Sequence, residues 1–334
     1  MVRKAMNLIA GDVGGTNTRL LLAEYTGGLV NVLFEKDYSS LAYLDFYEIL
    51  RKFLQESNCL HPIDAACFGV AGPVKDNEAR VTNLPWEIKV KDLCELLGTS
   101  TVSLINDFVA VSHGISVLKD QDVINIQSGN QPAAVNSHPT SVIMGAGTGL
   151  GVACRTWVND HYHIVSSETG HTDFAPATQL QTELLYWLQK THAHVSLESL
   201  LSGRGFQTIY SFLRDVKNIP ESLLIRESII AGDPAKVITD TALLRDDELC
   251  IATVELFVQI YGSAAGNVAL HYYPVDEVLI AGGIAPKIQA LIHSPLFVGA
   301  FTQKGLMTSN LQKIAIKLIT QDRLGLHGAL FTLY

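Results

Sequence analysis

Two glycine-rich turns hold the residues of this 334-residue sequence that are best suited to bind an anion. The first turn lies between two short apolar runs in residues 8–22, so we predict a strand, a tight turn and a second strand. Glycine has no Cβ, so Gly14 and Gly15 can take a positive φ and bring backbone N–H groups close to a phosphate. An ordinary β-turn is the alternative, because Gly-Gly steps favour tight hairpins in any case. The predicted phosphate-binding turn consists of Gly11, Asp12, Val13, Gly14, Gly15 and Thr16.

Asp12 stands where its carboxylate would lie beside the bound anion. A carboxylate and a phosphate that lie side by side repel each other unless a cation or a bridging water lies between them. Mg²⁺ is commonly bound through one or two carboxylates, phosphate oxygens and several water molecules. We therefore predict that Asp12 binds Mg²⁺ through water.

A second glycine-rich turn repeats this device in residues 141–155, again between two apolar runs that we predict to be strands. Its spacing does not satisfy G-x-G-x-x-G and a strand follows it, so the dinucleotide-binding fingerprint is excluded. A Walker A motif is excluded too, because the sequence contains no Gly-Lys pair. The residues predicted to bind phosphate here are Gly145, Gly147, Thr148 and Gly149, and a third glycine step, Gly282-Gly283, follows a predicted strand.

Asn106 and Asp107 follow a short apolar run, residues 102–105, that we predict to be a buried strand. Strands and helices alternate in this part of the sequence, which predicts a mainly parallel sheet. Ligands of such sheets bind at the carboxyl ends of the strands, so both side chains are well placed for chemistry. The alternative is that Asp107 only caps the helix that follows it.

Further polar candidates lie after the second glycine turn. Glu168 and His171 form one E-x-x-H pair, but a di-iron bundle needs two such pairs on long helices, so a metal site is the weaker interpretation. Glu198 could be only a favourable charge in the first turn of a helix over residues 197–201. We interpret two histidine pairs, each separated by one residue, as solvated side chains: His161/His163 and His192/His194.

The predicted elements form an α/β chain of two domains. Apolar residues at helical spacing predict an amphipathic helix over residues 41–56 and a long apolar helix over about 249–273. Polar residues and proline predict a long loop over 127–139. We place the small domain at residues 1–118, completed by a C-terminal helix at 321–334, and the large domain at 119–320.

Charge and composition exclude several classes of protein. The net charge is −9 and no basic cluster occurs, which argues against a nucleic-acid partner. No apolar run approaches membrane-spanning length, and Gly11 and Asp12 interrupt the first run too early for a signal peptide. The five cysteines are scattered and include no C-x-x-C pair, as expected of thiols in a reducing cytosol. We therefore expect a soluble cytoplasmic protein with no nucleic-acid or membrane partner.

The motifs taken together resemble those of bacterial glucokinases, which belong to the hexokinase, actin and Hsp70 fold group. The similar segments are, in chain order, GDVGGTNTRL, INDFVAV, GAGTGLGV, SETGH followed by TDFAP, and LIAGGIAP. The resemblance covers nearly the whole chain. It implies an α/β fold with two domains of the actin-like ATPase (ribonuclease H-like) type and a cleft between them. It also implies ATP-dependent phosphorylation of D-glucose at O6, with Mg²⁺ as the metal and a homodimer as the assembly.

The resemblance also implies roles for individual residues. The two glycine turns would bind the phosphates of ATP, and residues 279–286, which include Gly282 and Gly283, would contact the adenosine. Asp107 would be the general base that takes the proton of the sugar's 6-hydroxyl. The residues that would hold the sugar hydroxyls are Asn106, Asp107, Glu168, His171 and Glu198.

The sequence departs from the family pattern at Ser166 and Ser167, where relatives usually carry residues such as proline and glycine. This departure leaves the sugar selectivity open. The cysteine-rich zinc motif of the related repressor and kinase (ROK) family is missing, which favours the simpler glucokinase branch. The alternatives are a kinase of the same fold that acts on another hexose or uses polyphosphate, and a non-catalytic sugar-sensing or actin-like protein.

Overall fold

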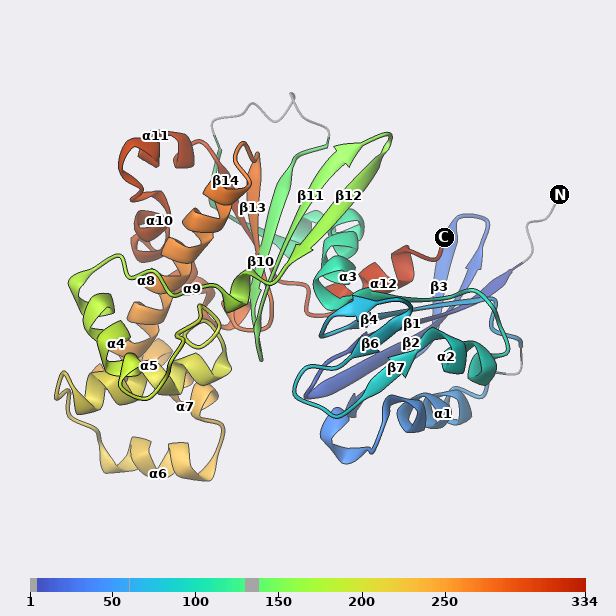
Figure 1. Ribbon diagram of the computed structural model, residues 1–334, viewed down its shortest axis with the longest axis horizontal. Helices are drawn as coiled ribbons and strands as arrows, with labels where there is room; N and C mark the ends of the chain where they lie inside the picture. Colours follow the sequence, from blue (N-terminus) through green and yellow to red (C-terminus); the bar gives the residue numbers. More distant parts are fainter. Residues whose placement is uncertain (1–4, 60, 130–137) are drawn as a thin grey trace. The chain divides into compact units, whose positions relative to one another are not determined.

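The computed structural model describes residues 5–59, 61–129 and 138–334, and the chain forms two compact units (Figure 1). Each unit has its own sheet and its own hydrophobic core. Unit 1 contains the chain through Lys119 together with Arg323–Tyr334, and unit 2 contains Asp120–Asp322.

The main sheet of unit 1 combines a hairpin with parallel strands. Its strands are, in spatial order, β3 (Leu29–Ser39), β2 (Asn17–Thr26), β1 (Met6–Val13), β4 (Ala65–Val70) and β8 (Val102–Asn106). β1 is antiparallel to β2 and parallel to β4, and β4 is parallel to β8. A small antiparallel sheet is formed by β5 (Val74–Lys75), β6 (Glu78–Arg80) and β7 (Glu87–Lys89). The helical segments are η1 (Ser40–Ala42), α1 (Phe46–Glu56), α2 (Val90–Leu97), α3 (Asp107–Gly114), η2 (Ile115–Val117) and α12 (Leu324–Phe331).

Successive side chains of a strand point to opposite faces of the sheet, and both faces of the inner strands β1, β2 and β4 are buried. Ile9 and Leu20 pack on one face in a cluster that includes residues of α1. Leu8 and Ala10 pack on the other face with Leu326 of α12. A strand that is covered on both faces carries apolar side chains on both of them. This explains why the sequence shows continuous apolar runs here instead of an alternation of apolar and polar residues.

The sheet of unit 2 repeats the hairpin-plus-parallel plan. Its strands are, in spatial order, β12 (His161–Ser167), β11 (Leu150–Val158), β10 (Ser141–Ala146), β13 (Glu277–Ala281), β14 (Ala315–Ile319) and β9 (Val123–Gln127). β10, β13 and β14 are parallel neighbours. The longer helices are α4 (Gln179–Gln189), α5 (Gly203–Asp215), α6 (Leu223–Ala231), α7 (Pro234–Leu244), α8 (Glu248–His271) and α10 (Pro295–Thr302). The short ones are η3 (Asp120–Asp122), η4 (Thr169–His171), η5 (Ala285–Ile288), α9 (Gln289–Ile292), η6 (Gly305–Met307) and α11 (Thr308–Leu311).

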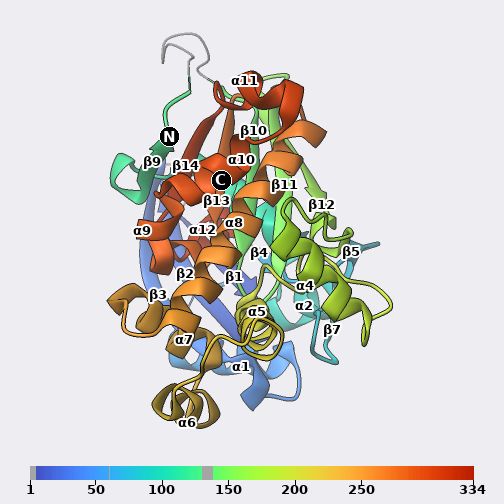
Figure 2. The same cartoon turned by 90° about the vertical axis from the view of Figure 1, so that its left-hand side faces the viewer.

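The helix α8 is the centre of the unit 2 core. It packs against α5, α7 and α10, as Figure 2 shows from one side. Phe257 and Tyr261 of α8 are fully buried. The expectation that no segment reaches membrane-spanning length is wrong for α8, which is long and apolar enough to cross a membrane. However, 78% of its most apolar stretch is buried inside the protein, so its hydrophobicity is used for packing in unit 2.

The prediction for α1 was wrong at its beginning. The helix starts at Phe46, and Leu41 and Leu44, which the sequence pattern placed on its apolar face, are 71% and 87% exposed. The reason is a helix cap: the side chain of Asp45 accepts a hydrogen bond from the backbone of Glu48, whose carboxylate accepts one from the backbone of Leu44. This reciprocal pair starts the helix five residues later than its apolar periodicity suggests.

The predicted helix over residues 197–201 does not form. These residues form only a single turn, in which Leu201 donates to the carbonyl of Leu197. The N–H groups of Leu197 and Glu198 pair with a distant segment, at the carbonyls of Thr172 and Gly170. Gly203, which the sequence placed after this helix, is the first residue of α5. Such long-range backbone pairing leaves no trace in local periodicity.

Other predicted elements are confirmed, among them the strand before Asn106 and the hairpin in residues 141–155. The predicted loop over 127–139 begins correctly, because Gln127 is the last residue of β9, but most of it lies outside the described residues. The sequence analysis did not predict several elements, which are β3, β5, β6, β7, β9, β12, α6, α7 and α10.

Two glycines allow α3 and α12 to lie side by side in unit 1 (Figure 1). A Cβ on Gly328 of α12 would lie 1.8 Å from the backbone oxygen of Ala110, and one on Gly114 of α3 would lie 2.3 Å from that of Leu324. Both obstacles are backbone atoms, which cannot move away cheaply. The close approach of these helices therefore requires hydrogen at both positions.

We predict that Gly328→Ala lowers the free energy of unfolding by about 1–3 kcal/mol, because the added methyl group overpacks the contact between the helices. The matched control is Gly299→Ala in α10, where no heavy atom of the described residues, apart from its chain neighbours and the backbone of its own helix, lies within 4 Å of the added Cβ. The control should raise stability by up to about 1 kcal/mol, the usual gain of alanine over glycine in a helix. Thermal unfolding followed by circular dichroism measures both, and equal stability of the two variants would contradict this packing.

Candidate functional site

The first glycine turn connects β1 to β2 in unit 1 and is held in shape by Ser40. Gly14 donates its backbone N–H to the carbonyl of Asn17 at 3.0 Å. The hydroxyl of Ser40 donates to the carbonyl of Gly14 at 2.8 Å, and its N–H donates to the carbonyl of Thr16 at 2.9 Å. The same hydroxyl lies 3.0 Å from that of Thr18, where both are buried. A residue outside the motif thus fixes the conformation of the turn.

The glycines of this turn are required for space rather than for backbone freedom. Neither Gly14 nor Gly15 has a positive φ, so that part of the sequence argument was wrong. A Cβ on Gly15 would lie 2.9 Å from the carbonyl oxygen of Thr82. One on Gly11 would lie 2.5 Å from the ring of Phe68. Thr16, at the end of the turn, is exposed and its hydroxyl can face solvent or a ligand.

Asp12 is paired across the sheet with Arg19, a residue that the sequence analysis did not select. Their Cα atoms are partners in the β1–β2 register, and a guanidinium nitrogen of Arg19 lies 3.8 Å from the carboxylate of Asp12. Arg19 also lies 3.6 Å from Asp37, its partner on β3. Burial raises the pKa of Asp12, the Arg19 charge opposes this, and Asp37 adds to it. An acidic residue two strands away, out of reach of a local motif, therefore influences Asp12.

The residues around Asp12 fit a weakly held Mg²⁺ better than a complete metal site. No group of three or more His, Cys, Asp or Glu that could hold a metal occurs within residues 5–59, 61–129 and 138–334. Asp12 is 28% exposed, so its carboxylate can reach an ion, and its cationic neighbour Arg19 competes for the same charge. This matches the way in which Mg²⁺ keeps most of its water and takes its other ligands from phosphates.

Asn106 and Asp107 lie at the junction of β8 and α3, and both side chains accept hydrogen bonds from the start of this helix. Asn106 is the helix cap, since its side-chain oxygen accepts from the N–H groups of Phe108 and Val109 at 2.9 and 3.3 Å. Its amide nitrogen donates to the carbonyl of Gly72 at 3.3 Å. The capping role that the sequence left open for Asp107 therefore belongs mainly to Asn106, although Asp107 also accepts from Phe108 at 2.9 Å. Asp107 occupies the first position of α3, where the helix dipole favours its negative form.

The strand register brings the first turn and this junction to one edge of the unit 1 sheet. Val13 of β1 is level with Val70 of β4, and Val70 is level with Asn106 of β8. The residues that follow these three positions all leave the sheet at the carboxyl ends of parallel strands. Asp107 and the turn after Val13 therefore emerge on the same edge, which is where ligands of such sheets bind.

The second glycine turn, in unit 2, is braced by Glu198 and Gly203. Gly147 donates to the carbonyl of Gly149 at 2.8 Å and accepts from the N–H of Gly203 at 2.9 Å. The carboxylate of Glu198 accepts a hydrogen bond from the N–H of Leu150 at 2.9 Å. A Cβ on Gly149 would lie 2.6 Å from this carboxylate, so only glycine lets Glu198 reach the backbone. The sequence predicts both parts but not their contact.

Tyr261 of α8 supports the strand that leads into this turn. Its hydroxyl lies 3.3 Å from both the carbonyl oxygen of Met144 and the N–H of Ala146. Burial raises the pKa of Tyr261, so the hydroxyl stays protonated and can donate to the carbonyl. The apolar helix α8 thus makes a polar contact at the point where β10 reaches the glycines.

The third glycine step lies beside the second. Gly282 has a φ of +83°, and a Cβ there would lie 2.5 Å from the carbonyl oxygen of Ala146. Ile284 donates its N–H to the same carbonyl at 3.2 Å. Gly145 is level with Ala281 in the parallel register, so both glycine segments leave the unit 2 sheet at one edge. Gly282 and Gly283 are exposed.

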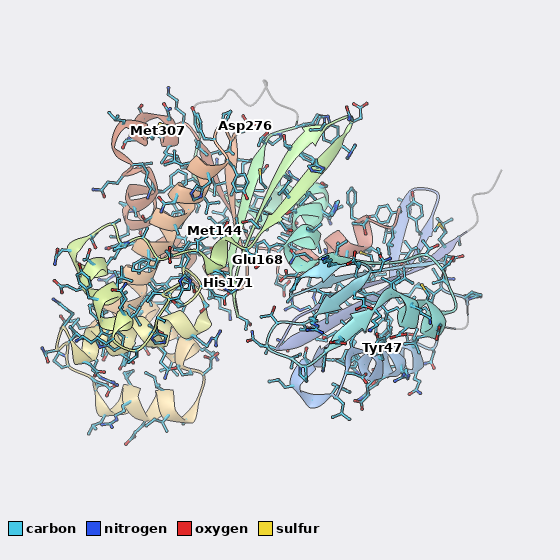
Figure 3. The ribbon with its side chains drawn as sticks, in the orientation of Figure 1. Tyr47, Met144, Glu168, His171, Asp276 and Met307 are labelled. Carbon is cyan, nitrogen blue, oxygen red and sulfur yellow. The ribbon has the colours of Figure 1, made fainter. Side chains whose placement is uncertain are left out.

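Glu168 and His171 lie together at the end of β12, as Figure 3 shows. The imidazole of His171 is 3.9 Å from the carboxylate of Glu168, and the two side chains are 60% and 72% exposed. Backbone pairing joins their turn to the segment of Glu198, because Glu198 donates to the carbonyl of Gly170 at 2.9 Å. Three of the polar residues selected from the sequence therefore belong to one pair of adjacent segments in unit 2.

The structure thus groups the predicted residues in two sets. Unit 1 carries Gly11, Asp12, Val13, Gly14, Gly15, Thr16, Asn106 and Asp107. Unit 2 carries Gly145, Gly147, Thr148, Gly149, Glu168, His171, Glu198, Gly282 and Gly283. In chemical terms the first set offers carboxylates and turn amides, and the second offers turn amides with acceptors and donors for hydroxyl groups.

We predict that Glu198→Ala speeds hydrogen exchange of the Leu150 amide by about tenfold, because the loss of a charged acceptor removes one hydrogen bond. Hydrogen exchange followed by NMR measures the effect in the absence of any ligand. Glu183→Ala is the matched control, since this carboxylate binds Lys217 and Gln179 near α4 instead of the turn. Unchanged protection of Leu150 in Glu198→Ala would mean that the contact does not hold the turn.

Comparison with known proteins identifies this arrangement. The family profile described as glucokinase matches residues 9–334. The chain is 39% identical to a glucokinase of Nostoc sp. over 337 aligned positions, which cover 96% of this chain and 97% of the relative. It is 37% identical to a glucokinase of Synechocystis sp., with 97% of both chains covered.

Solved structures of glucokinases have the same fold as this chain. The chain is similar to the crystal structure of a glucokinase from an Antarctic psychrotroph, with a TM-score of 0.80, 30% identity and 98% of both chains covered. A glucokinase from Balamuthia mandrillaris in complex with glucose has the same fold, with a TM-score of 0.80, 21% identity and coverage of 98% of this chain and 93% of that one. The expected α/β fold of the actin-like ATPase type is confirmed.

Proposed function

The chain belongs to the glucokinase family, and on that premise we propose that it transfers the γ-phosphoryl group of ATP to O6 of D-glucose. The observation that carries this proposal is the family match over residues 9–334. It is supported by the two glycine turns, which resemble paired phosphate loops, and by a carboxylate at the edge of each sheet. The product would be glucose 6-phosphate, the usual entry of glucose into glycolysis.

We assign ATP binding to the glycine segments. In unit 1 these are Gly11 to Thr16, and in unit 2 they are Gly145 to Gly149, which would use backbone N–H groups for the phosphates. Gly282 and Gly283 would accept the adenosine, since a residue without a side chain leaves room for a flat ring. The braces on these turns, Ser40 and Glu198, support the assignment because a fixed turn presents its amides without reorganisation.

We assign the sugar to Asn106, Asp107, Glu168, His171 and Glu198. A neutral polyol is recognised by acceptors and amide or imidazole donors, and these side chains supply both. Asp107 would take the proton of the 6-hydroxyl as its oxygen bonds to the γ-phosphorus, and the bond to the β-phosphate oxygen breaks to release ADP. Its place at the start of α3 favours the charged form that a base needs.

We assign Mg²⁺ to Asp12, in agreement with the weak site described above. When bound, the ion would neutralise charge on the β- and γ-phosphates. The chain's own contribution is Arg19, whose guanidinium lies 3.8 Å from the carboxylate of Asp12 and offsets part of the rise in its pKa that burial causes. We also propose that the protein is a cytoplasmic homodimer, which rests on the family resemblance and which size-exclusion chromatography with light scattering would test.

We predict that Asp107→Asn lowers kcat by about 10²–10⁴, the usual yield of general-base catalysis, and changes the KM for glucose much less. A coupled assay of glucose 6-phosphate formation measures both constants. The same assay with mannose, fructose and galactose, and with polyphosphate in place of ATP, defines the substrate and the donor. Asp92→Asn on α2 is the control, because this aspartate is exposed, was not assigned to the site, and accepts a hydrogen bond from the hydroxyl of Tyr47.

An unchanged kcat in Asp107→Asn would remove Asp107 from the mechanism. ATP turnover that does not depend on any hexose would overturn the function itself. These two results are distinct, since the first concerns one residue and the second concerns the reaction.

We predict that Asp12→Asn raises the Mg²⁺ concentration for half-maximal activity by about tenfold, because the amide lacks the charge that attracts the hydrated ion. The readout is activity at fixed ATP over a Mg²⁺ titration, together with Mg·ATP binding by calorimetry. Asp92→Asn again serves as control. A titration curve identical to that of the unmodified protein would exclude Asp12 as the magnesium residue.

A further inference from the structure

His194 has contacts that its interpretation as a solvated side chain does not explain. One ring nitrogen, Nδ1, lies 3.2 Å from the carboxylate of Asp173, and the other, Nε2, lies 3.0 Å from the backbone oxygen of His171. The side chain of His194 is 55% exposed and that of Asp173 is 91% exposed. The imidazole thus bridges two points of the turn that carries Glu168 and His171.

Both atoms that face His194 are hydrogen-bond acceptors. A neutral imidazole has a single N–H and can donate to only one of them, whereas the protonated ring has two N–H groups and can donate to both. The full bridge between Asp173 and the carbonyl of His171 therefore requires the imidazolium form. When the imidazolium loses a proton, only one of the two hydrogen bonds remains. The lone pair of the other ring nitrogen then faces an acceptor oxygen and is repelled by it.

The bridge lies at the end of a short ladder between two segments. Phe174 donates to the carbonyl of Val195 at 2.8 Å, Leu197 donates to that of Thr172 at 3.0 Å, and Glu198 donates to that of Gly170 at 2.9 Å. One segment carries Glu168 and His171, and the other carries Glu198. His194 is the residue whose side chain crosses from the second segment to the first.

We propose that His194 is a positioning residue of the hexose site and that its protonated ring clamps the turn of Glu168 and His171 to the segment of Glu198. The proposal rests on the proposed function, because it assumes that these three residues hold the sugar. It adds a residue that does not touch the substrate, and it makes sugar affinity depend on the protonation of that residue. Protonation tightens the site, and deprotonation loosens it.

The charged groups near His194 have separate partners. Asp173 is the carboxylate that it contacts, and Glu168 is paired with the ring of His171 at 3.9 Å. Glu198 directs its carboxylate to the N–H of Leu150. The ring of His192 is turned back toward α4, with Nδ1 2.9 Å from the hydroxyl of Thr191. His192 is therefore a matched control for a histidine of the same loop without the bridge.

The test compares the KM for glucose at pH 6 and pH 8 in the unmodified protein, His194→Gln, His194→Arg and His192→Gln. The effect of one exposed, charged contact is about two- to fivefold in affinity. The ratio of the KM of His194→Gln to that of the unmodified protein should therefore be about two to five at pH 6 and fall toward one at pH 8. His194→Arg keeps donors at both pH values, so the ratio of its KM to that of the unmodified protein should be close to one at pH 6 and fall below one at pH 8. His192→Gln should give a ratio of one throughout, and kcat should change little in every variant.

Any effect of pH on other residues of the site contributes to all variants alike and cancels in these ratios. A KM ratio for His194→Gln that is the same at both pH values overturns the proposal. So does a large fall in kcat with an unchanged KM, since the clamp acts on binding.

A second measurement separates failure of the clamp from failure of the proposed function. Hydrogen exchange of the Glu198 amide, measured without sugar, should be faster in His194→Gln than in the unmodified protein at pH 6, and the difference should shrink at pH 8. Equal exchange at both pH values overturns the clamp whatever the substrate. If the exchange difference is found but no hexose is phosphorylated, the clamp stands and the function assigned to the site fails.

Discussion

The register of the parallel strands is the constraint on which the rest of this structure depends. In unit 1 it places Val13, Val70 and Asn106 level with one another, and in unit 2 it places Gly145 level with Ala281. Each row marks the point where chain segments leave a sheet at the carboxyl ends of its strands. Glycine turns and polar side chains from distant parts of the sequence are brought together at these points by backbone hydrogen bonds alone.

The glycine turns owe their shape to residues outside them. Ser40 holds the first turn through both its hydroxyl and its N–H, and Glu198 holds the second through its carboxylate. Glycine is needed at positions 15, 149 and 282 mainly because another atom approaches too closely for a Cβ, and only Gly282 of these also has a positive φ. A turn braced in this way presents its amides in fixed directions, which is what electrostatic stabilisation of a phosphoryl group requires.

Charged side chains outside the motifs also act on the candidate site residues. Asp12 would be disfavoured as an anion by its burial, and the guanidinium of Arg19 offsets part of that effect. Asp37 and Arg19 extend the row of alternating charges to a third strand. In unit 2 the ring of His194 plays a comparable part for the turn of Glu168 and His171, because it links acceptors on a segment that is remote in sequence. These partners become neighbours only when strands and loops pair.

Local patterns in the sequence were sufficient for several parts of this protein. The apolar runs beside the glycines predicted both hairpins, and the apolar run at residues 102–105 predicted β8. The motifs in chain order predicted the family and the fold, which the comparisons confirm. The roles assigned to Asp107 and the other site residues are predictions of the same kind.

Only the tertiary structure decided which residues support the site. It showed that Asp45 starts α1, that residues 197–201 pair with another segment instead of forming a helix, and that Asn106 is the main cap of α3. It also supplied Arg19 and Ser40, neither of which stands out by type or spacing, and the contacts of His194, which the sequence alone did not indicate. The physical reason is that propensity and periodicity act within a few residues, whereas a cap, a charge partner or a backbone ladder joins atoms whose distance along the chain is arbitrary.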